Sequence, residues 1–106
     1  MLYQKPRGNP ENLAATRLCS LMKSKGWFIK KIGASRFNIG WPDYYAYHAA
    51  HGHRWIEAKA PGGKLRASQS KLFAEMTSLG DKVYVLEGPE TYGRLFKEPN
   101  WRQYRR

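Results

Sequence analysis

The chain has 106 residues and a formal charge of +11 at pH 7, because 19 lysines and arginines oppose only 8 acidic residues. An apolar share of 42% supports one folded domain over residues 1–106 and excludes wholesale disorder. The single cysteine excludes an intramolecular disulfide framework and a multi-cysteine zinc site.

The excess of positive charge favours nucleic acid as the partner. An anionic membrane is the weaker candidate, because no cationic amphipathic helix stands out and no apolar run approaches the ~20 residues of a membrane span. The first residues, Met1-Leu2-Tyr3, do not begin a signal peptide. We therefore expect a soluble, cytoplasmic protein with no membrane partner.

The first third of the chain predicts a helix followed by a strand. Asn9 suits the helix cap and Pro10 the first helical position, and the helix should continue to about Lys25 and stop at Gly26. The next run, residues 27–32, is aromatic and β-branched and therefore predicts a strand.

A β-hairpin is predicted in the middle of the chain. Residues 33–41 are expected to form a loop, and the tyrosine-rich residues 42–48 a second strand. A turn over residues 49–53 leads into a third strand over residues 54–60, which Pro61-Gly62-Gly63 ends.

The last part of the chain predicts a helix over residues 65–79, a fourth strand over 82–86 and a short helix over 91–96. The order is then α-β-β-β-α-β-α, an α/β fold in which helices flank a small mixed sheet. A basic, aromatic tail at about residues 97–106 has three alternatives: it stacks on unpaired bases, docks on a partner subunit or is disordered.

Two acids and a lysine are the first candidates for chemistry. Residues two apart on a strand share a face, so Glu57 and Lys59 project together while Ile56 and Ala58 face the other way. Pairing of the second and third strands brings Asp43 beside them. Acids held so close repel each other unless a divalent cation lies between them, and Mg²⁺ prefers carboxylate, phosphate and water oxygens.

A lysine beside such a cation can orient or activate the attacking water and offset charge on a phosphate. The alternative is that Asp43, Glu57 and Lys59 are each ordinary solvated strand residues, which is the commoner situation for any one of them alone.

Two polar residues continue the apolar stripes of the predicted helices. Glu11 extends the stripe of the first helix, and Gln69 lies in the middle of the stripe of the second. A buried polar group needs a partner, so both are candidates for the same site. The alternatives are an interaction of Glu11 with the helix dipole and a hydrogen bond from Gln69 to a strand backbone.

Together these residues form an ordered motif that resembles the virus-type replication-repair nuclease domain (VRR-NUC) of the PD-(D/E)xK nuclease superfamily. The similarity runs from about Glu11 to Leu86. Its segments are Gly40-Trp41-Pro42-Asp43, then Trp55-Ile56-Glu57-Ala58-Lys59-Ala60-Pro61-Gly62-Gly63-Lys64-Leu65, then Gln69.

The resemblance implies that Asp43 and Glu57 bind a metal, that Lys59 is the catalytic lysine, and that Gln69 and Glu11 belong to the site. It also implies phosphodiester hydrolysis that depends on Mg²⁺ or Mn²⁺ and leaves 5′-phosphate ends. We expect the backbone carbonyl of Ala58 to be a further metal ligand, and Glu11 to contribute through water or a second metal. Gln69 is expected to orient Lys59 or to contact the substrate.

Small stand-alone members of the family resemble Holliday-junction resolvases that act on branched DNA as homodimers. This chain departs from the family pattern at Trp41 and at Tyr44-Tyr45, where aliphatic residues are usual, and both departures bear on substrate preference rather than on the chemistry.

Basic and amide residues near the proposed site are candidates for phosphate contacts. They are Lys31, Arg36, Asn38, Lys64, Arg66 and Lys71, with Lys5, Arg7 and Lys30 as further basic candidates. The cluster of His48, His51 and His53 suggests zinc, but a solvated turn is favoured because no cysteine or acid accompanies it.

The sequence therefore predicts a Mg²⁺-dependent endonuclease, structure-selective on branched DNA, homodimeric and without a small-molecule cofactor. The alternatives are a non-catalytic basic DNA-binding module on a nuclease scaffold and an RNA-binding or ribosome-associated basic protein, for which the charge alone would suffice.

Overall fold

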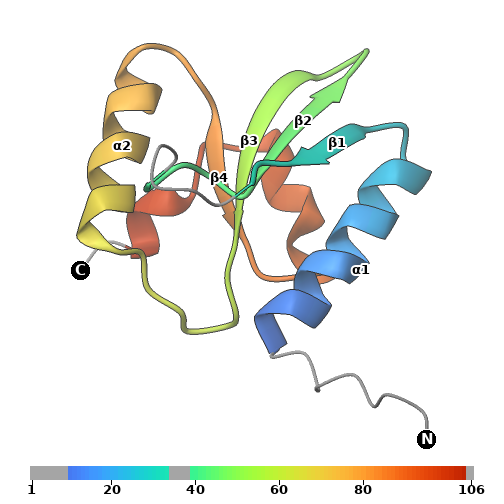
Figure 1. Ribbon diagram of the computed structural model, residues 1–106. Helices are drawn as coiled ribbons and strands as arrows, with labels where there is room; N and C mark the ends of the chain where they lie inside the picture. Colours follow the sequence, from blue (N-terminus) through green and yellow to red (C-terminus); the bar gives the residue numbers. More distant parts are fainter. Residues whose placement is uncertain (1–9, 34–38, 105–106) are drawn as a thin grey trace, which may run out of the picture.

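A four-stranded mixed sheet organises the fold (Figure 1). The computed structural model describes residues 10–33 and 39–104, the side chains of Pro10 and Glu11 excepted. No helix in those ranges is long and apolar enough to cross a membrane. The elements are α1 (Pro10–Ser24), β1 (Phe28–Lys31), β2 (Tyr44–His48), β3 (Gly52–Ala58), α2 (Ala67–Ser78), β4 (Val83–Leu86) and the 3₁₀ helices η1 (Pro89–Phe96) and η2 (Trp101–Tyr104).

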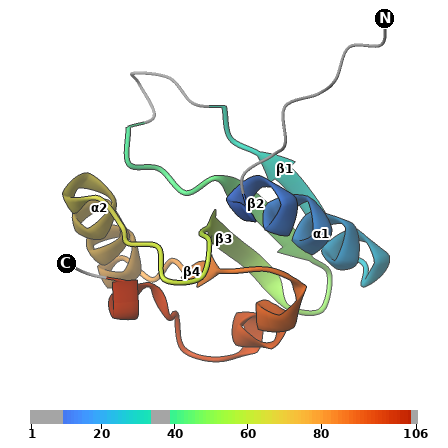
Figure 2. The ribbon, with the colours of Figure 1, turned by 90° about the horizontal axis from the view of Figure 1, so that it is seen from below.

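The strands lie in the order β1-β2-β3-β4, antiparallel except for the parallel β3–β4 pair. Side chains alternate between the two faces. Ile56 of β3 joins the core formed with α1 and η1, whereas Trp55 packs against the core formed with α2 and η2. The two long helices accordingly lie on opposite sides of the sheet (Figure 2). Glu57 belongs to the same face as Trp55, which is the α2 side.

The predicted α/β class and the predicted strands are confirmed, with shifted boundaries. The second strand begins at Tyr44 instead of residue 42, because the buried Pro42 has no N–H to donate to a ladder. The third strand covers residues 52–58 instead of 54–60, so Lys59 lies just beyond its end. The second helix begins at Ala67, since the backbone N–H of Leu65 donates to the carbonyl of Tyr104 in η2 (3.2 Å). The predicted cap Asn9 lies outside the described residues.

The end of the chain is the clearest correction. The short helix predicted over residues 91–96 is the 3₁₀ helix η1, and residues 101–104 of the predicted tail form a second one, η2. Trp101 is only 2% exposed, and its indole Nε1–H donates to Thr77 Oγ1 at 3.1 Å. Tyr104 is buried in the same core. Neither ring is therefore free to stack on a base, and residues 105–106 lie outside the described chain.

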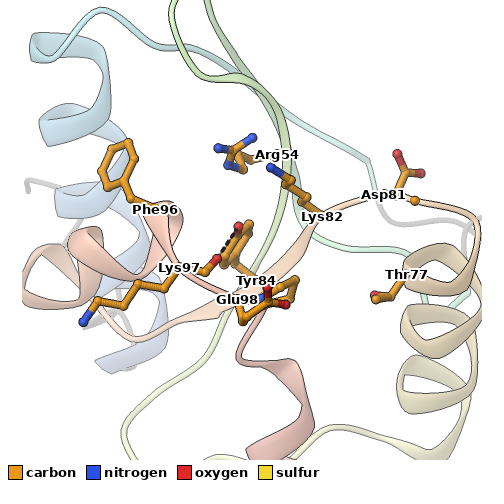
Figure 3. Close-up of a pocket in the computed structure, with 10 residues that line it drawn as sticks. Arg54, Thr77, Asp81, Lys82, Tyr84, Phe96, Lys97 and Glu98 are labelled. Atoms are coloured by element: carbon orange, nitrogen blue, oxygen red, sulfur yellow. Dashed lines mark hydrogen bonds between the residues drawn. The ribbon is translucent and has the colours of Figure 1, made fainter.

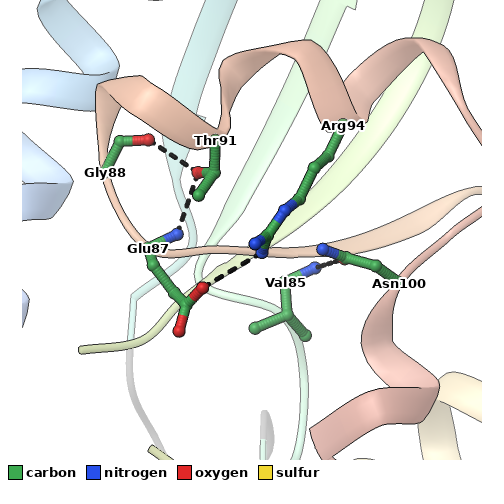
Figure 4. Close-up of polar contacts among 6 residues, drawn as sticks. All are labelled: Val85, Glu87, Gly88, Thr91, Arg94 and Asn100. Carbon is green, nitrogen blue, oxygen red and sulfur yellow. Dashed lines mark hydrogen bonds and ion pairs between the residues drawn. The ribbon is translucent and has the colours of Figure 1, made fainter. Parts of the chain in front are cut away.

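Polar contacts fasten η1 and η2 to β4, the last strand of the sheet (Figure 4). The Val85 N–H donates to the side-chain oxygen of Asn100 at 2.8 Å. This bond satisfies a backbone donor on the outer edge of β4. Glu87 donates its backbone N–H to Thr91 Oγ1 (3.0 Å) and forms an ion pair with Arg94 (3.1 Å). These contacts hold the C-terminal segment against β4, where η1 packs on the α1 side of the sheet and η2 on the α2 side.

Gly40 holds the segment before β2 against the start of α2. Its φ is +83°, and a Cβ atom there would lie 3.1 Å from the backbone oxygen of Ser68. Only glycine tolerates both conditions without strain. Asp43 follows three residues later, so this close approach helps to set its position.

We predict that Gly40→Ala lowers the free energy of unfolding by about 2 kcal/mol, because the left-handed conformation and the contact with Ser68 both oppose a side chain. The matched control is Gly33→Ala, where a Cβ would meet no described atom within 4 Å and φ is not positive. Urea unfolding monitored by circular dichroism measures both. Equal midpoints for the two variants would contradict this role of Gly40.

Candidate functional site

Four of the residues predicted from the sequence meet at the C-terminal end of β3. Asp43 lies just before β2, and its Oδ2 accepts a hydrogen bond from the backbone N–H of Ala58 at 3.0 Å. Ala58 is the neighbour of Glu57, so this single contact brings the two acids together. Lys59 and Gln69 complete the group by contacts to Glu57.

Glu57 is the centre of the cluster. It is 3% exposed, and its Oε2 accepts a hydrogen bond from the Gln69 side-chain amide (2.9 Å) and lies 3.3 Å from Lys59 Nζ. Its other oxygen, Oε1, is buried and has no hydrogen-bond partner among the described residues. Burial, and then the nearby charge of Asp43, raise the pKa of Glu57 to about 7, although Lys59 and Gln69 oppose the rise.

Gln69 is positioned by the start of α2. It is buried in the first turn of that helix, and its Oε1 accepts the backbone N–H of Arg66 at 2.9 Å. This bond directs the amide nitrogen toward Glu57. The sequence suggested that Gln69 orients Lys59 or contacts substrate, whereas its side chain contacts the carboxylate that Lys59 also contacts.

Lys59 is held by the connection between β3 and α2. Its backbone N–H donates to the Leu86 carbonyl (3.0 Å), which extends the pairing with β4 by one residue. A turn then closes through the Gly63 N–H and the Ala60 carbonyl (2.9 Å), with Gly62 at φ +81°. The ammonium group is therefore presented from an anchored backbone, and its side chain is 13% exposed.

The donor set suits a hard divalent cation. Asp43 and Glu57 supply carboxylate oxygens, and the buried, unpartnered Oε1 of Glu57 is the kind of atom that a cation would satisfy. No group of three or more His, Cys, Asp or Glu side chains is placed to hold a metal within the described residues. Glu11 lies in α1, but its side chain is outside that description, so its role and that of the Ala58 carbonyl stay predictions.

The predicted phosphate contacts divide into two groups. Lys31, Lys64, Arg66 and Lys71 are exposed, whereas Arg36 and Asn38, like Lys5 and Arg7, lie outside the described residues. Lys31 pairs in register with Tyr44, the residue after Asp43, and Lys64 and Arg66 lie on the connection from Lys59 to α2. Their contact with phosphate stays a prediction.

The histidine cluster forms no metal site in the described structure. Both ring nitrogens of His48 are engaged, one with the Lys25 carbonyl at 3.1 Å and the other with the Ala50 N–H at 3.0 Å. Its ring packs on His51 with centroids 4.5 Å apart, and His53 hydrogen-bonds Tyr45 instead. His51 and His53 are exposed, and His48 is half-buried.

Two charged residues that the sequence analysis did not single out have structural partners. Glu87 lies just after β4, at the same end of the sheet as Glu57, but is paired with Arg94. Arg54 is buried, and its guanidinium donates to the carbonyls of Leu95 and His53 (3.0 and 2.8 Å). Burial of a charged residue cannot be read from its immediate neighbours in the sequence.

Arg54 lines a hollow at the other end of the sheet (Figure 3). Lys82 and Asp81, which precede β4, and Lys97 and Glu98, which follow η1, line it as well. Because β3 and β4 are parallel, their starts, where this hollow lies, are remote from the carboxylate cluster at their ends. Its mixed charges give it no clear preference for an anion or a cation.

No family model matches the chain, and no curated protein matches it.

The raised pKa of Glu57 predicts how stability depends on pH without metal. The folded state keeps the Glu57 proton up to about pH 7, whereas the unfolded chain releases it near pH 4.5, so Glu57 loses its stabilising contribution as pH rises through 7. The shift corresponds to roughly 3 kcal/mol. In EDTA, the free energy of unfolding of the wild type should therefore fall relative to that of Glu57→Gln as the pH rises from 5 to 8. The change in this difference should be at most roughly 3 kcal/mol.

Chemical unfolding at the two pH values measures this difference. The control Glu75→Gln removes an exposed carboxylate on α2 and should keep the wild-type pH dependence, since Glu57 is intact. A Glu57→Gln curve parallel to the wild type would show that Glu57 is ionised throughout.

Proposed function

We propose that the chain is a Mg²⁺-dependent endonuclease with a VRR-NUC-like core of the PD-(D/E)xK type, hydrolysing DNA phosphodiester bonds. The observation that carries this proposal is the contact of Asp43 with Ala58, which gathers two acids, a lysine and a glutamine from three separate segments at one end of the sheet. The surplus of positive charge supports a polyanionic substrate.

Asp43 and Glu57 are the residues that would hold the cation. When bound, Mg²⁺ supplies charge stabilisation at the phosphate and a water of lowered pKa. Lys59, anchored 3.3 Å from Glu57, is suited to orient the attacking water and to offset charge on the phosphate. Gln69 keeps the Glu57 carboxylate in place through its amide. It is therefore a positioning residue.

The alternative is a basic module that binds DNA or RNA without cutting it. The charge of +11 is sufficient for that function. A pure binder of polyanions, however, gains nothing from two acids close together, one of them buried with an unpartnered oxygen. The carboxylate cluster therefore favours catalysis.

We predict Mg²⁺-dependent cleavage that Glu57→Gln and Lys59→Ala each reduce by at least about 100-fold, because one removes a metal ligand and the other a positioned ammonium. Cleavage of labelled four-way junctions, flaps, single strands and duplex measures the effect, with Glu75→Gln as the active control. Tight binding to these substrates without cutting in Mg²⁺ or Mn²⁺ would support the non-catalytic alternative.

The same assay tests the proposed selectivity for branched DNA. A homodimer acting on a four-way junction should make two symmetric cuts, since the junction presents two equivalent strands. Sizing of the protein alone and with the junction gives its oligomeric state. Equal cutting of plain duplex by a monomer would contradict a resolvase-like activity while leaving the nuclease proposal intact.

A further inference from the structure

A run of aromatic rings crosses the middle of the sheet next to the carboxylate cluster. Tyr47 lies 4.6 Å from His53, and Tyr45 lies 5.5 Å from His53 and 5.2 Å from Trp55, measured between ring centroids. Trp41, from the segment before β2, lies 5.5 Å from Trp55. The rings are tilted or edge-on to one another, which is a favourable arrangement for aromatic pairs.

Strand register shows that these rings share one face. Tyr45 is opposite Trp55 and Tyr47 is opposite His53, while Phe28 of β1 is opposite Tyr47. Directly opposite residues point to the same side of an antiparallel pair. We call this surface the aromatic face; it consists of Phe28, Trp41, Tyr45, Tyr47, His53 and Trp55.

Among residues 10–33 and 39–104, no helix covers the aromatic face over β1 and β2. On this side of the sheet, α2 and η2 pack on β3 and β4, where Trp55 meets their core. Beyond them, Phe28 is 57% exposed, Tyr47 42% and Trp41 39%. Phe28 and Tyr47 are neighbours in register, and Trp41 joins them through the rings of Trp55 and Tyr45. Contiguous exposed apolar surface of this kind is typical of interaction sites.

The aromatic face runs directly into the candidate site. Glu57 is two residues beyond Trp55 on β3 and therefore points to the same side of the sheet. Lys30 lies opposite Tyr45 in register and is exposed on this side as well. A strand lying along the face would thus meet aromatic rings, a lysine and then the carboxylates.

We propose that the aromatic face binds single-stranded DNA by stacking unpaired bases on its exposed rings beside the cleavage site. A flexible single strand offers the base faces that a paired duplex hides, and its phosphates complement the charge of +11. A second copy of the chain is the weaker occupant, because it would bring the same positive charge to the surface. The inference rests on the proposed function and adds its substrate class: DNA with an unpaired segment next to the scissile bond.

Binding is measured in EDTA, so that no cleavage is required. The probes are a labelled 15-nucleotide thymidine strand, an abasic strand of the same length and charge, and a duplex. Because stacking contributes about 1–3 kcal/mol per base, the wild type should bind the thymidine strand at least about 10-fold tighter than the abasic strand. Tyr47→Ala and Phe28→Ala should each lower the ratio of thymidine-strand to abasic-strand affinity by about 5-fold or more and leave the affinity for the abasic strand unchanged.

Two variants serve as controls. Phe96→Ala removes a ring that is 45% exposed but packs on Trp27 and Tyr92 on the α1 side, so it should keep the preference. Tyr47→Trp keeps an aromatic ring at this position and should also keep the preference for the thymidine strand. Melting curves check that every variant is folded, and the comparison of the two strands on the wild type needs no variant at all.

Equal wild-type affinity for the thymidine and abasic strands would overturn the proposal, because phosphate contacts would then explain all the binding. So would a dimer that Tyr47→Ala dissociates without affecting strand binding, since the face would then be a subunit interface. Failure of the nuclease proposal is a separate result: preserved base-dependent binding in EDTA with no cleavage in Mg²⁺ would reject catalysis and keep the aromatic face as a binding surface.

Discussion

The burial of Glu57 beside a second acid is the constraint on which the site depends. A carboxylate that is 3% exposed is costly to ionise, and the charge of Asp43 increases that cost, so the pKa of Glu57 rises to about 7. Lys59 and Gln69 compensate at one oxygen only, Oε2. The other oxygen has no hydrogen-bond partner among the described residues, and this observation supports our proposal of a cation at that oxygen.

The fold brings distant segments to this carboxylate. Parallel pairing of β3 with β4 places the end of β3 beside Leu86, and the close approach of Gly40 to Ser68 holds the segment that carries Asp43. On the face of Glu57, α2 packs against the β3–β4 half of the sheet, and Phe28 and Tyr47 on the β1–β2 half are exposed in the part of the chain that the structure describes. One surface therefore combines acids suited to a cation with rings suited to unpaired bases, and this combination links the two proposals.

Local sequence patterns predicted the positions of the site residues more accurately than they predicted the structure of the C-terminal segment. The two-residue spacing of Glu57 and Lys59 predicts that they project together, and they are in contact although Lys59 lies just beyond the end of β3. The predicted pairing of the second and third strands brings Asp43 to Ala58. The partner of Gln69 was not predictable, because it depends on how α2 docks on the sheet. Residues 101–104 were predicted as part of a tail because a single short 3₁₀ helix gives no periodic signal in the sequence; the burial of Trp101 and Tyr104 against α2 defines it.

Paramagnetic broadening by Mn²⁺ in a ¹⁵N-labelled sample tests most directly whether the two acids form a cation site. Substoichiometric Mn²⁺ should broaden the amide signals of Ala58 and Lys59 first and spare that of Val83 at the far end of the parallel pair. Asp43→Asn should abolish the selective broadening. Broadening centred on the histidine turn around His51, or a pattern that Asp43→Asn leaves unchanged, would contradict a cation site at Asp43 and Glu57.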